Sequence, residues 1–253
     1  MKGHSELLIL LTNDDGAEAQ GILTMKRHLS PLGKLVVVAP YEERSAVSHG
    51  LTIHVPIRQV EIGEDHYALT GTPADCVLFA VRKFLPRLPD LVVSGINHGP
   101  NLGDDILYSG TVAGAREAAL HNIPALAVSL VTRSEAPDFE DAAAYACQMI
   151  RELFPDSIPP GTYFNINVPE ERPKDYRFTR QGTKRVISSI EEKKDPRGRA
   201  YFWIGPDASE WEVEADTDYQ AVQEGLASVT PLQRDQTDYR TLRDLNGRRR
   251  GKS

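Results

Sequence analysis

The chain has 253 residues, of which 40% are hydrophobic, and its formal net charge is −7. This length suits one large domain, or one domain with an extension, and the apolar share is enough for a buried core. The negative charge argues against stable binding of nucleic acid, because the chain lacks a basic footprint. Only residues 248–253 are strongly basic, and we interpret them as a frayed, disordered tail.

Two cysteines, Cys76 and Cys147, lie far apart in helix-like surroundings. Their number and spacing fit neither a disulfide framework nor a zinc site, so we expect small buried apolar residues in a reducing compartment. The apolar run at the N-terminus is too short for a signal peptide, and no run reaches membrane-spanning length. We therefore expect a soluble cytoplasmic protein with no membrane partner.

Residues 7–11 are an unbroken apolar run that ends in Asn13, Asp14, Asp15 and Gly16. Such a run is typical of a parallel strand that is buried on both faces. Residues 20–32 follow with helical spacing, and residues 34–39 form a second buried strand closed by Pro40. Strand, helix and strand within this length predict a right-handed βαβ unit.

The next segments continue this alternation of strands and helices. The loop 41–50 carries Ser45 and leads to short strands at 51–60 and 66–69, with a turn at 63–65. Thr72 is a good N-cap for a helix that runs to about residue 84, and residues 89–94 predict another buried strand. Ser45 has two open interpretations, a metal ligand or a hydroxyl that bonds its own backbone.

A polar loop of unusual length, 95–111, follows that strand and contains Asn97 and Asn101. Compact domains rarely contain so long a loop without a functional reason. Residues 112–120 are plainly helical, so Ser109-Gly110-Thr111 lies at a helix start. The free N–H groups there favour an anion, and ordinary N-capping by Ser109 or Thr111 is the alternative.

The remaining α/β elements are a strand at 124–130, a helix at 139–154 and a strand at 163–168. We place the end of the α/β pattern there, with strand segments at 178–183 and 186–190, a solvated turn at 191–198, a return strand at 201–204 and a helix at 218–225. Trp203 and Trp211 lie in this part and need apolar cover, which suggests a partner subunit.

Together these patterns predict an α/β, Rossmann-like three-layer fold with a mostly parallel sheet. We expect a catalytic core at 1–172 and, at 173–253, a C-terminal β-hairpin and helix extension used in oligomerisation. Because ligands bind outside the carboxyl ends of the strands in such sheets, Asp14 and Asp15 are expected at the mouth of a site. Two adjacent carboxylates suit a hard divalent metal, and an Asx-type turn closing the strand is the alternative.

Three stretches resemble the SurE survival-protein family of metal-dependent 5'/3'-nucleotidases: residues 10–16, 94–105 and 108–118. The resemblance implies that Asp14, Asp15, Ser45 and Asn97 hold one divalent cation per subunit, Mg²⁺ or Mn²⁺. It also implies nucleoside monophosphates as substrates and a homodimer or homotetramer formed through the C-terminal extension.

On this basis we expect metal-dependent hydrolysis of nucleoside 5'- and 3'-monophosphates, with Asp14 or Asp15 as the catalytic proton acceptor. The residues expected to hold the phosphate are Asn13, Asn101, Ser109, Gly110 and Thr111.

Two other readings compete with this hypothesis. A haloacid-dehalogenase-type phosphatase needs a nucleophilic Asp where this chain has Asn13, which forms no acyl phosphate. A receiver-like or nucleotide-binding regulatory protein without turnover also places an acidic pair after its first strand. Its phosphoacceptor Asp would lie near Ser94-Gly95, where neither residue is acidic.

Overall fold

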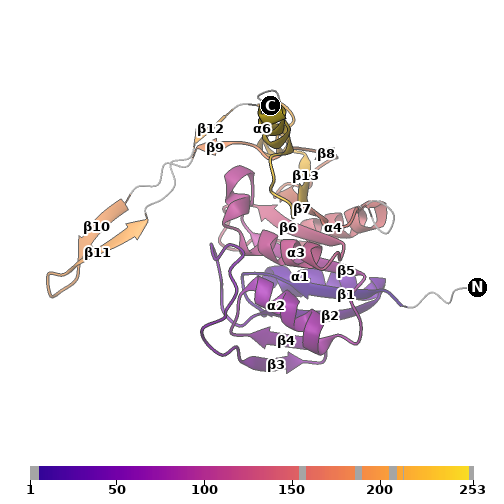
Figure 1. Cartoon of the computed structure of the whole chain (residues 1–253). Helices are drawn as coiled ribbons and strands as arrows, with labels where there is room; N and C mark the ends of the chain where they lie inside the picture. Colours follow the sequence, from indigo (N-terminus) through magenta and orange to yellow (C-terminus); the bar gives the residue numbers. More distant parts are fainter. Residues whose placement is uncertain (1–5, 154–157, 186–189, 205–209, 213, 251–253) are drawn as a thin grey trace, which may run out of the picture.

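The computed structural model describes residues 6–153, 158–185, 190–204, 210–212 and 214–250. Its main sheet has nine strands in the order β3-β4-β2-β1-β5-β6-β7-β13-β8. Helices cover both faces of this sheet (Figure 1). The predicted α/β three-layer fold is therefore confirmed.

The centre of the sheet is parallel, as the unbroken apolar runs predict. Every neighbouring pair among its six central strands is parallel. In spatial order these strands are β4 (His66–Leu69), β2 (Lys34–Pro40), β1 (Leu8–Thr12), β5 (Leu91–His98), β6 (Ala125–Val131) and β7 (Thr162–Pro169).

Successive residues of β1 face two separate apolar cores, because side chains alternate along a strand. Ile9 and Leu11 pack with α1 (Gln20–Leu29) and α4 (Glu140–Leu153) on one face of the sheet. Leu8 and Leu10 pack with α2 (Pro73–Phe79) and α3 (Gly110–Leu120) on the other. Each residue of β1 is buried, which makes this strand the middle of the fold.

Helix caps explain where two of these helices begin. Thr72 and Asp75 form a capping box at the start of α2, which continues through a π-helical turn, η2 (Ala80–Phe84). Ser109 caps α3 and accepts a hydrogen bond from the N–H of Val112. Two short 3₁₀ helices complete the helical part of the core, η1 (Ser30–Leu32) after α1 and η3 (Gly103–Leu107) before α3.

The chain reverses its direction of travel across the sheet at β1. It moves from β1 to β2 on one side, and it later returns to place β5 on the other side of β1. A crevice forms at such a switch point, outside the carboxyl ends of the two strands. Asp14 follows β1 and Asn97 lies at the end of β5, so the topology brings both residues to this crevice.

The sheet does not end at Pro169, which corrects the sequence analysis. β13 (Ala227–Gln233) pairs antiparallel with β7, and β8 (Tyr176–Phe178) pairs parallel with β13. Both strands come from beyond residue 172, so strand pairing joins the two expected parts of the chain. The division into 1–172 and 173–253 stays a prediction. Sequence patterns missed this because a strand returning after an excursion has no distinctive local signature.

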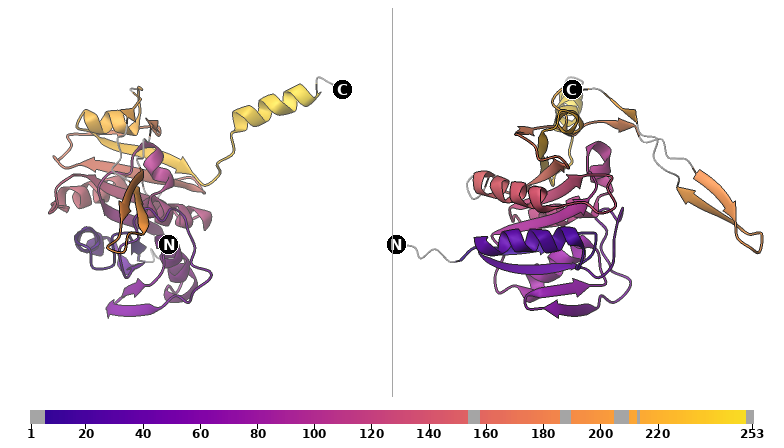
Figure 2. Two further views of the ribbon diagram at one scale, coloured as in Figure 1. Left: turned by 90° about the vertical axis from the view of Figure 1, so that its left-hand side faces the viewer. Right: turned by 180° about the vertical axis from the view of Figure 1, so that it is seen from behind.

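A hairpin formed by β10 (Ile190–Lys194) and β11 (Ala200–Ile204) confirms the predicted excursion. It projects away from the body, as does α6 (Tyr239–Arg250) (Figure 2). β9 (Lys184–Arg185) pairs with β12 (Glu210–Trp211), and α5 (Asp218–Gln223) precedes β13. The side chain of Trp211 and the predicted strand at 186–189 lie outside the described residues.

Two further expectations were wrong. Residues 51–58 form no strand, and β3 (Gln59–Gly63) begins only after them, paired antiparallel with β4. Residues 248–250 belong to α6 instead of a disordered end, while 251–253 lie outside the described residues. α6 is very polar, so a core-facing apolar pattern gave no warning of it.

Candidate functional site

A cavity of about 230 Å³ opens at the switch point, between the ends of β1 and β5 and the start of α3. We call it the phosphate cavity. Five residues expected at the site line it: Asp14, Ser45, Asn97, Asn101 and Ser109. The fold therefore brings together side chains that lie far apart along the chain. His98 also lines this cavity, as do Asp105 and Tyr108, to which the sequence had given no role.

Asp14 is almost fully buried, with 4% of its surface exposed. Its Oδ1 accepts a hydrogen bond from the hydroxyl of Thr111. The backbone N–H groups of Gly110 and Thr111 also bond this carboxylate. Burial raises the pKa of Asp14, and these hydrogen bonds oppose the rise. The anion that faces the N-terminus of α3 is therefore the carboxylate of Asp14.

Asp15 is partly exposed and lies on the outer side of the same turn. Its Oδ2 accepts a hydrogen bond from the backbone N–H of His98 at 3.3 Å. Burial, and next the negative charge of Asp14, raise the pKa of Asp15 to about 7. Among the described residues, no Lys or Arg forms an ion pair with either aspartate. The two acids thus create a negative site without a cationic side chain to balance it.

Asn97 is aimed by an irregularity in β5. The register between β5 and β6 shifts between Gly95 and Asn97, which is the effect of a bulge. The Nδ2 of Asn97 donates to the carbonyl of Gly99 at 2.8 Å, and its Oδ1 lies 3.4 Å from the hydroxyl of Thr111. The amide oxygen of Asn97 consequently faces the first turn of α3, where Asp14 is also held.

Ser45 reaches the cavity from the loop after β2. A hydrogen bond from the backbone N–H of Arg44 to the carbonyl of Asp14, at 2.7 Å, anchors this loop beside the end of β1. Ser48 bonds the segment before α3 through its N–H and its hydroxyl. The hydroxyl of Ser45 donates to the carboxylate of Glu43 at 2.7 Å. A hydroxyl that donates in this way keeps its lone pairs available to a cation.

Asn101 is fixed by two asparagines of β7 that the sequence analysis did not single out. Its N–H donates to Oδ1 of Asn167 at 2.8 Å, and its carbonyl accepts from Nδ2 of Asn165 and of Asn167. Its own Nδ2 donates to Ser129 at 2.8 Å. A signal was present, because Asn165 and Asn167 alternate with apolar residues in a strand that is otherwise buried.

Three of the expected phosphate-binding residues have other places in the structure. Asn13 is fully buried, does not line the phosphate cavity, and donates from Nδ2 to the carbonyl of Gly16. It holds the turn that the sequence analysis had weighed as an alternative. Thr111 uses its hydroxyl on Asp14. Gly110 allows close approach, since a Cβ there would lie 2.8 Å from Cβ and Oδ2 of Asp14.

The donor set fits a hard divalent cation. Asp14, Asp15, Ser45 and Asn97 all offer oxygen atoms, the ligands that Mg²⁺ and Mn²⁺ prefer. Within the described residues, no group of three His, Cys, Asp or Glu side chains is arranged to hold a metal. A set with only two carboxylates is not in conflict with that finding, because its other donors are a hydroxyl and an amide.

Comparison with known proteins gives one consistent family. The family model described as "Survival protein SurE" matches residues 9–188. A "5'-nucleotidase SurE" of Syntrophotalea carbinolica is 46% identical over 244 residues, which cover 95% of this chain and 96% of that protein. Another, from Pelobacter propionicus, is 44% identical over 238 residues, covering 93% of this chain and 96% of that protein.

A solved structure agrees. The crystal structure of a SurE protein from Aquifex aeolicus superimposes with a TM-score of 0.82 at 41% sequence identity, covering 94% of this chain and 97% of that one. The residues matched by the family model, 9–188, include the turn after β1, the end of β5 and the start of α3. The chain belongs to the SurE survival-protein family.

Proposed function

We propose that this protein is a metal-dependent phosphomonoesterase that hydrolyses nucleoside 5'- and 3'-monophosphates to nucleoside and phosphate. Relatives that match this chain over nearly its whole length bear the name 5'-nucleotidase. The observation that carries the proposal is the convergence of Asp14, Ser45, Asn97 and Ser109 on one cavity beside the start of α3.

Asp14, Asp15, Ser45 and Asn97 would hold one divalent cation, Mg²⁺ or Mn²⁺. When bound, it supplies Lewis-acid polarisation of the phosphate ester and of water. The protein holds Asp14 in place through Thr111 and through the two N–H groups of α3. Asp14 or Asp15 accepts the proton of the attacking water. In the cation-free protein, burial and the charge of Asp14 raise the pKa of Asp15 to about 7.

Asn101 and Ser109 line the phosphate cavity and are the side chains we assign to the phosphate oxygens. Gly110 and Thr111 act on the phosphate indirectly, because their N–H groups and the Thr111 hydroxyl bond Asp14. Asn13 supports the turn that carries both aspartates. Of the five residues expected to hold the phosphate, two therefore keep that role and three support the aspartates.

Phosphate release from a panel of nucleoside 5'- and 3'-monophosphates tests the proposal. We expect turnover with Mg²⁺ or Mn²⁺ and its loss in excess chelator. Asp14→Asn should abolish turnover while the circular dichroism spectrum stays native. Asp65→Asn is a matched control in the turn between β3 and β4, at a residue with φ of 49° that Asn readily adopts. Full turnover in chelator, or in Asp14→Asn, contradicts the proposal.

The receiver-like or regulatory alternative makes a different prediction. A protein of that class would bind the cation and a nucleotide without releasing phosphate from any ester. Calorimetric binding measured beside the phosphate assay separates the two, because bound but intact nucleoside monophosphate would support the alternative.

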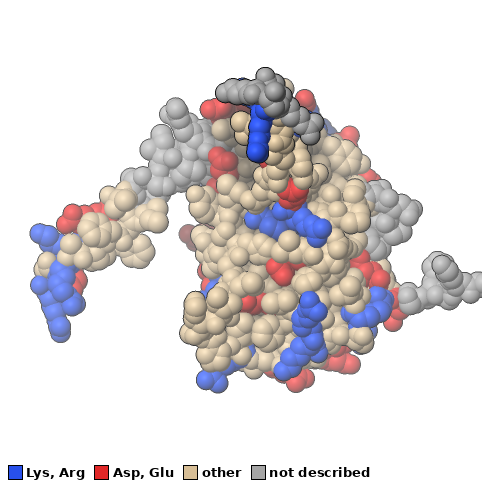
Figure 3. All heavy atoms as spheres, in the orientation of Figure 1, with Lys and Arg blue, Asp and Glu red and all other residues tan. Residues whose placement is uncertain are grey.

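The C-terminal extension supports a homodimer or homotetramer. The hairpin exposes several large apolar side chains: Ile190, Tyr201, Phe202, Trp203 and Ile204. Tyr239, Leu242 and Leu245 are similarly exposed on α6. Lys and Arg side chains gather at the far end of the hairpin (Figure 3). Projecting elements with so much exposed apolar surface are typical of interfaces between subunits.

We also propose that the protein is cytoplasmic and has no stable nucleic-acid partner. Among the described helices none has both the length and the apolar character needed to cross a bilayer. Both cysteines are buried and free, in keeping with a reducing compartment.

A further inference from the structure

A second cavity, of about 510 Å³, lies beside the phosphate cavity and shares His98 with it. It lies between the start of α1 and the segment before α4, and we call it the α1–α4 cavity. Its lining includes Asp15, Gln20, His98, Glu135, Ala136 and Asp138. Its volume is in the range of small-molecule sites.

We propose that the α1–α4 cavity binds the nucleoside part of the substrate. This inference rests on the proposed function. Asp14 borders the phosphate cavity and its chain neighbour Asp15 borders the α1–α4 cavity. A phosphate in the phosphate cavity, beside the cation that the two aspartates would hold, has its ester substituent next to the α1–α4 cavity. His98 stands between the two spaces, and it lines both.

The chemistry of the lining selects an uncharged group rich in hydrogen-bond donors. The lining includes the carboxylates of Asp15, Glu135 and Asp138 and the amide of Gln20, and it includes no Lys or Arg. Carboxylates accept hydrogen bonds from sugar hydroxyls and from base amino groups. They repel a second phosphate. Phe139 and Pro137 add apolar surface suited to a nucleobase.

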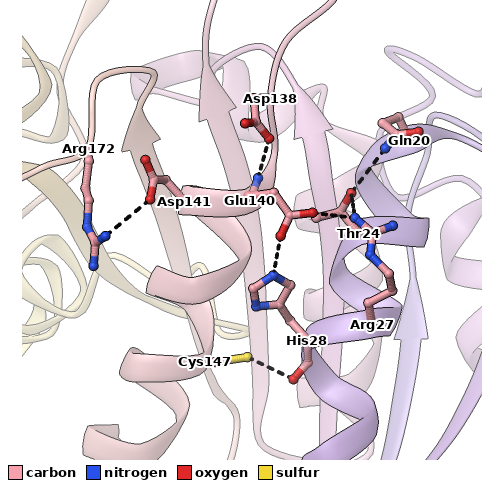
Figure 4. A network of polar contacts seen from close by, with 9 residues as sticks. All are labelled: Gln20, Thr24, Arg27, His28, Asp138, Glu140, Asp141, Cys147 and Arg172. Atoms are coloured by element: carbon pink, nitrogen blue, oxygen red, sulfur yellow. Dashed lines mark hydrogen bonds and ion pairs between the residues drawn. The ribbon is translucent and has the colours of Figure 1, made fainter.

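Contacts within the chain hold the walls of the α1–α4 cavity in place. His98 is fixed by a hydrogen bond between Nε2 and the carbonyl of Ser134 at 2.7 Å, and its ring meets Phe139 edge-on with centroids 6.4 Å apart. On the other side, Glu140 of α4 bonds Arg27 and His28 of α1 (Figure 4). Asp138 accepts from the N–H of Glu140 at 2.9 Å. Fixed walls reduce the ordering cost of binding.

A rival cavity of about 490 Å³ touches the phosphate cavity on another side, through Pro100. Arg133, Tyr219 and Gln223 are among its lining residues. None of the four proposed cation ligands, which include both aspartates, lines this rival cavity. This difference favours the α1–α4 cavity, and it also supplies a matched control.

The first test fills each cavity in turn with Ala136→Trp and Gln223→Trp, both at exposed positions. Ala136→Trp should raise KM for nucleoside 5'-monophosphates by about 10-fold or more, as expected when a well-formed pocket is blocked. Its inhibition constant for inorganic phosphate should stay within about 2-fold of wild type, because the phosphate cavity is untouched. Gln223→Trp should change neither value.

The inference is overturned if Gln223→Trp raises KM and Ala136→Trp does not. It is also overturned if Ala136→Trp weakens phosphate and substrate equally, since that would indicate distortion of the catalytic site. Calorimetric binding of free adenosine to wild type and to Ala136→Trp tests the cavity without turnover. Adenosine binding that Ala136→Trp removes would support the cavity even if no ester were hydrolysed, and binding that survives would exclude it.

A second test changes only charge. Wild type should discriminate against nucleoside 3',5'-bisphosphates relative to 5'-monophosphates. Glu135→Gln, an isosteric change at an exposed residue, should reduce that discrimination in kcat/KM by about 5-fold, the scale of one nearby charge in water. Glu170→Gln in the rival cavity is the control and should leave the ratio unchanged. An unchanged ratio in Glu135→Gln, or a shift only in the control, contradicts the inference.

Discussion

The hydroxyl of Thr111 donates a hydrogen bond to Oδ1 of Asp14, which joins the first turn of α3 to the turn after β1. The N–H groups of Gly110 and Thr111 bond the same carboxylate. A helix N-terminus attracts anions because its N–H groups are unpaired and its dipole is positive there. Here that capacity orients a buried acid, Asp14, which we propose as a cation ligand.

Removing this hydroxyl should therefore weaken cation binding. Thr111→Val keeps the shape of the side chain but leaves the buried carboxylate of Asp14 without its side-chain donor. We expect Mn²⁺ affinity, measured by calorimetry, to fall about 10- to 100-fold, as for other supports of metal ligands. Thr111→Ser keeps the hydroxyl and is the control. Equal affinity in the Val variant and wild type would show that Thr111 does not position Asp14.

Gly110 provides a steric test of the same contact. A Cβ at this position would lie 2.8 Å from Cβ and Oδ2 of Asp14 and 3.2 Å from the carbonyl of Arg44. Gly110→Ala should displace Asp14 and remove nearly all turnover in the phosphate-release assay. Gly247→Ala is the control, because that helical glycine has open space around it. It should keep full activity and gain about 0.5–1 kcal/mol in helix stability. Normal turnover in Gly110→Ala would mean that Asp14 is free to move.

The cation should compete with a proton at Asp15. Burial and the charge of Asp14 raise the pKa of Asp15 from 3.8 to about 7. Between these values the folded, cation-free protein holds a proton that the unfolded chain has released. Its stability should therefore fall as the pH rises from about 4 to 7. Cation affinity should rise over the same window, because the ligand must lose its proton.

Two measurements check this coupling. Urea unfolding of chelator-treated protein should show the fall in stability with pH, and Asp15→Asn should flatten it. Calorimetric Mn²⁺ titrations in buffers of different ionisation enthalpy should show proton release on binding at pH 6. Affinity that is constant between pH 5.5 and 7.5 would exclude Asp15 as a titrating ligand.

The sequence predicted the residues that line the phosphate cavity better than it predicted the residues that support them. Asp14 and Asp15 end an apolar run, so both the strand and its polar exit are local signals. Asn97 was expected in a loop, but β5 extends through His98 and a bulge redirects the side chain. A bulge depends on pairing with β6, which no single segment encodes. Thr111 was expected at the phosphate for a similar reason. Its hydroxyl instead bonds Asp14, and that contact between α3 and the turn after β1 is not encoded by either segment alone.

Strand pairing over long separations was the other gap. The strand at 227–233 was not recognised as part of the main sheet, because its partner β7 lies some sixty residues earlier in the chain. Residues such as Asp218 show what that pairing achieves. Its carboxylate accepts hydrogen bonds from the N–H groups of Gly103 and Gly182, so the C-terminal part holds the loop that carries Asn101.

The exposed hairpin should determine the oligomeric state. Trp203 is 59% exposed in the isolated chain, and its strand carries a row of exposed apolar residues. Trp203→Glu places a charge in the proposed interface, which should shift the protein to smaller species in light scattering. Leu88→Glu is the control, because Leu88 has a similar exposure, 53%, and lies far from the hairpin in sequence, in the loop before β5. It should leave the mass unchanged. A monomeric wild type would remove the basis for this role of the hairpin.

The asparagines of β7 should contribute unequally to the stability of the site. Asn167 both accepts from the N–H of Asn101 and donates to its carbonyl, whereas Asn165 only donates to that carbonyl. Asn167→Ala leaves a buried N–H unpaired, and we expect a loss of about 2–4 kcal/mol in unfolding free energy. Asn165→Ala leaves the carbonyl still paired with Asn167, so its loss should be about 1 kcal/mol.

Urea unfolding of both variants, with KM for nucleoside monophosphates beside it, measures this difference. Because Asn101 lines the phosphate cavity, Asn167→Ala should also raise KM more than Asn165→Ala does. The two substitutions remove the same atoms from neighbouring positions on one strand, so each serves as the control for the other. Equal losses of stability and equal KM values would mean that the N–H of Asn101 finds another acceptor, and that β7 does not set the position of the loop.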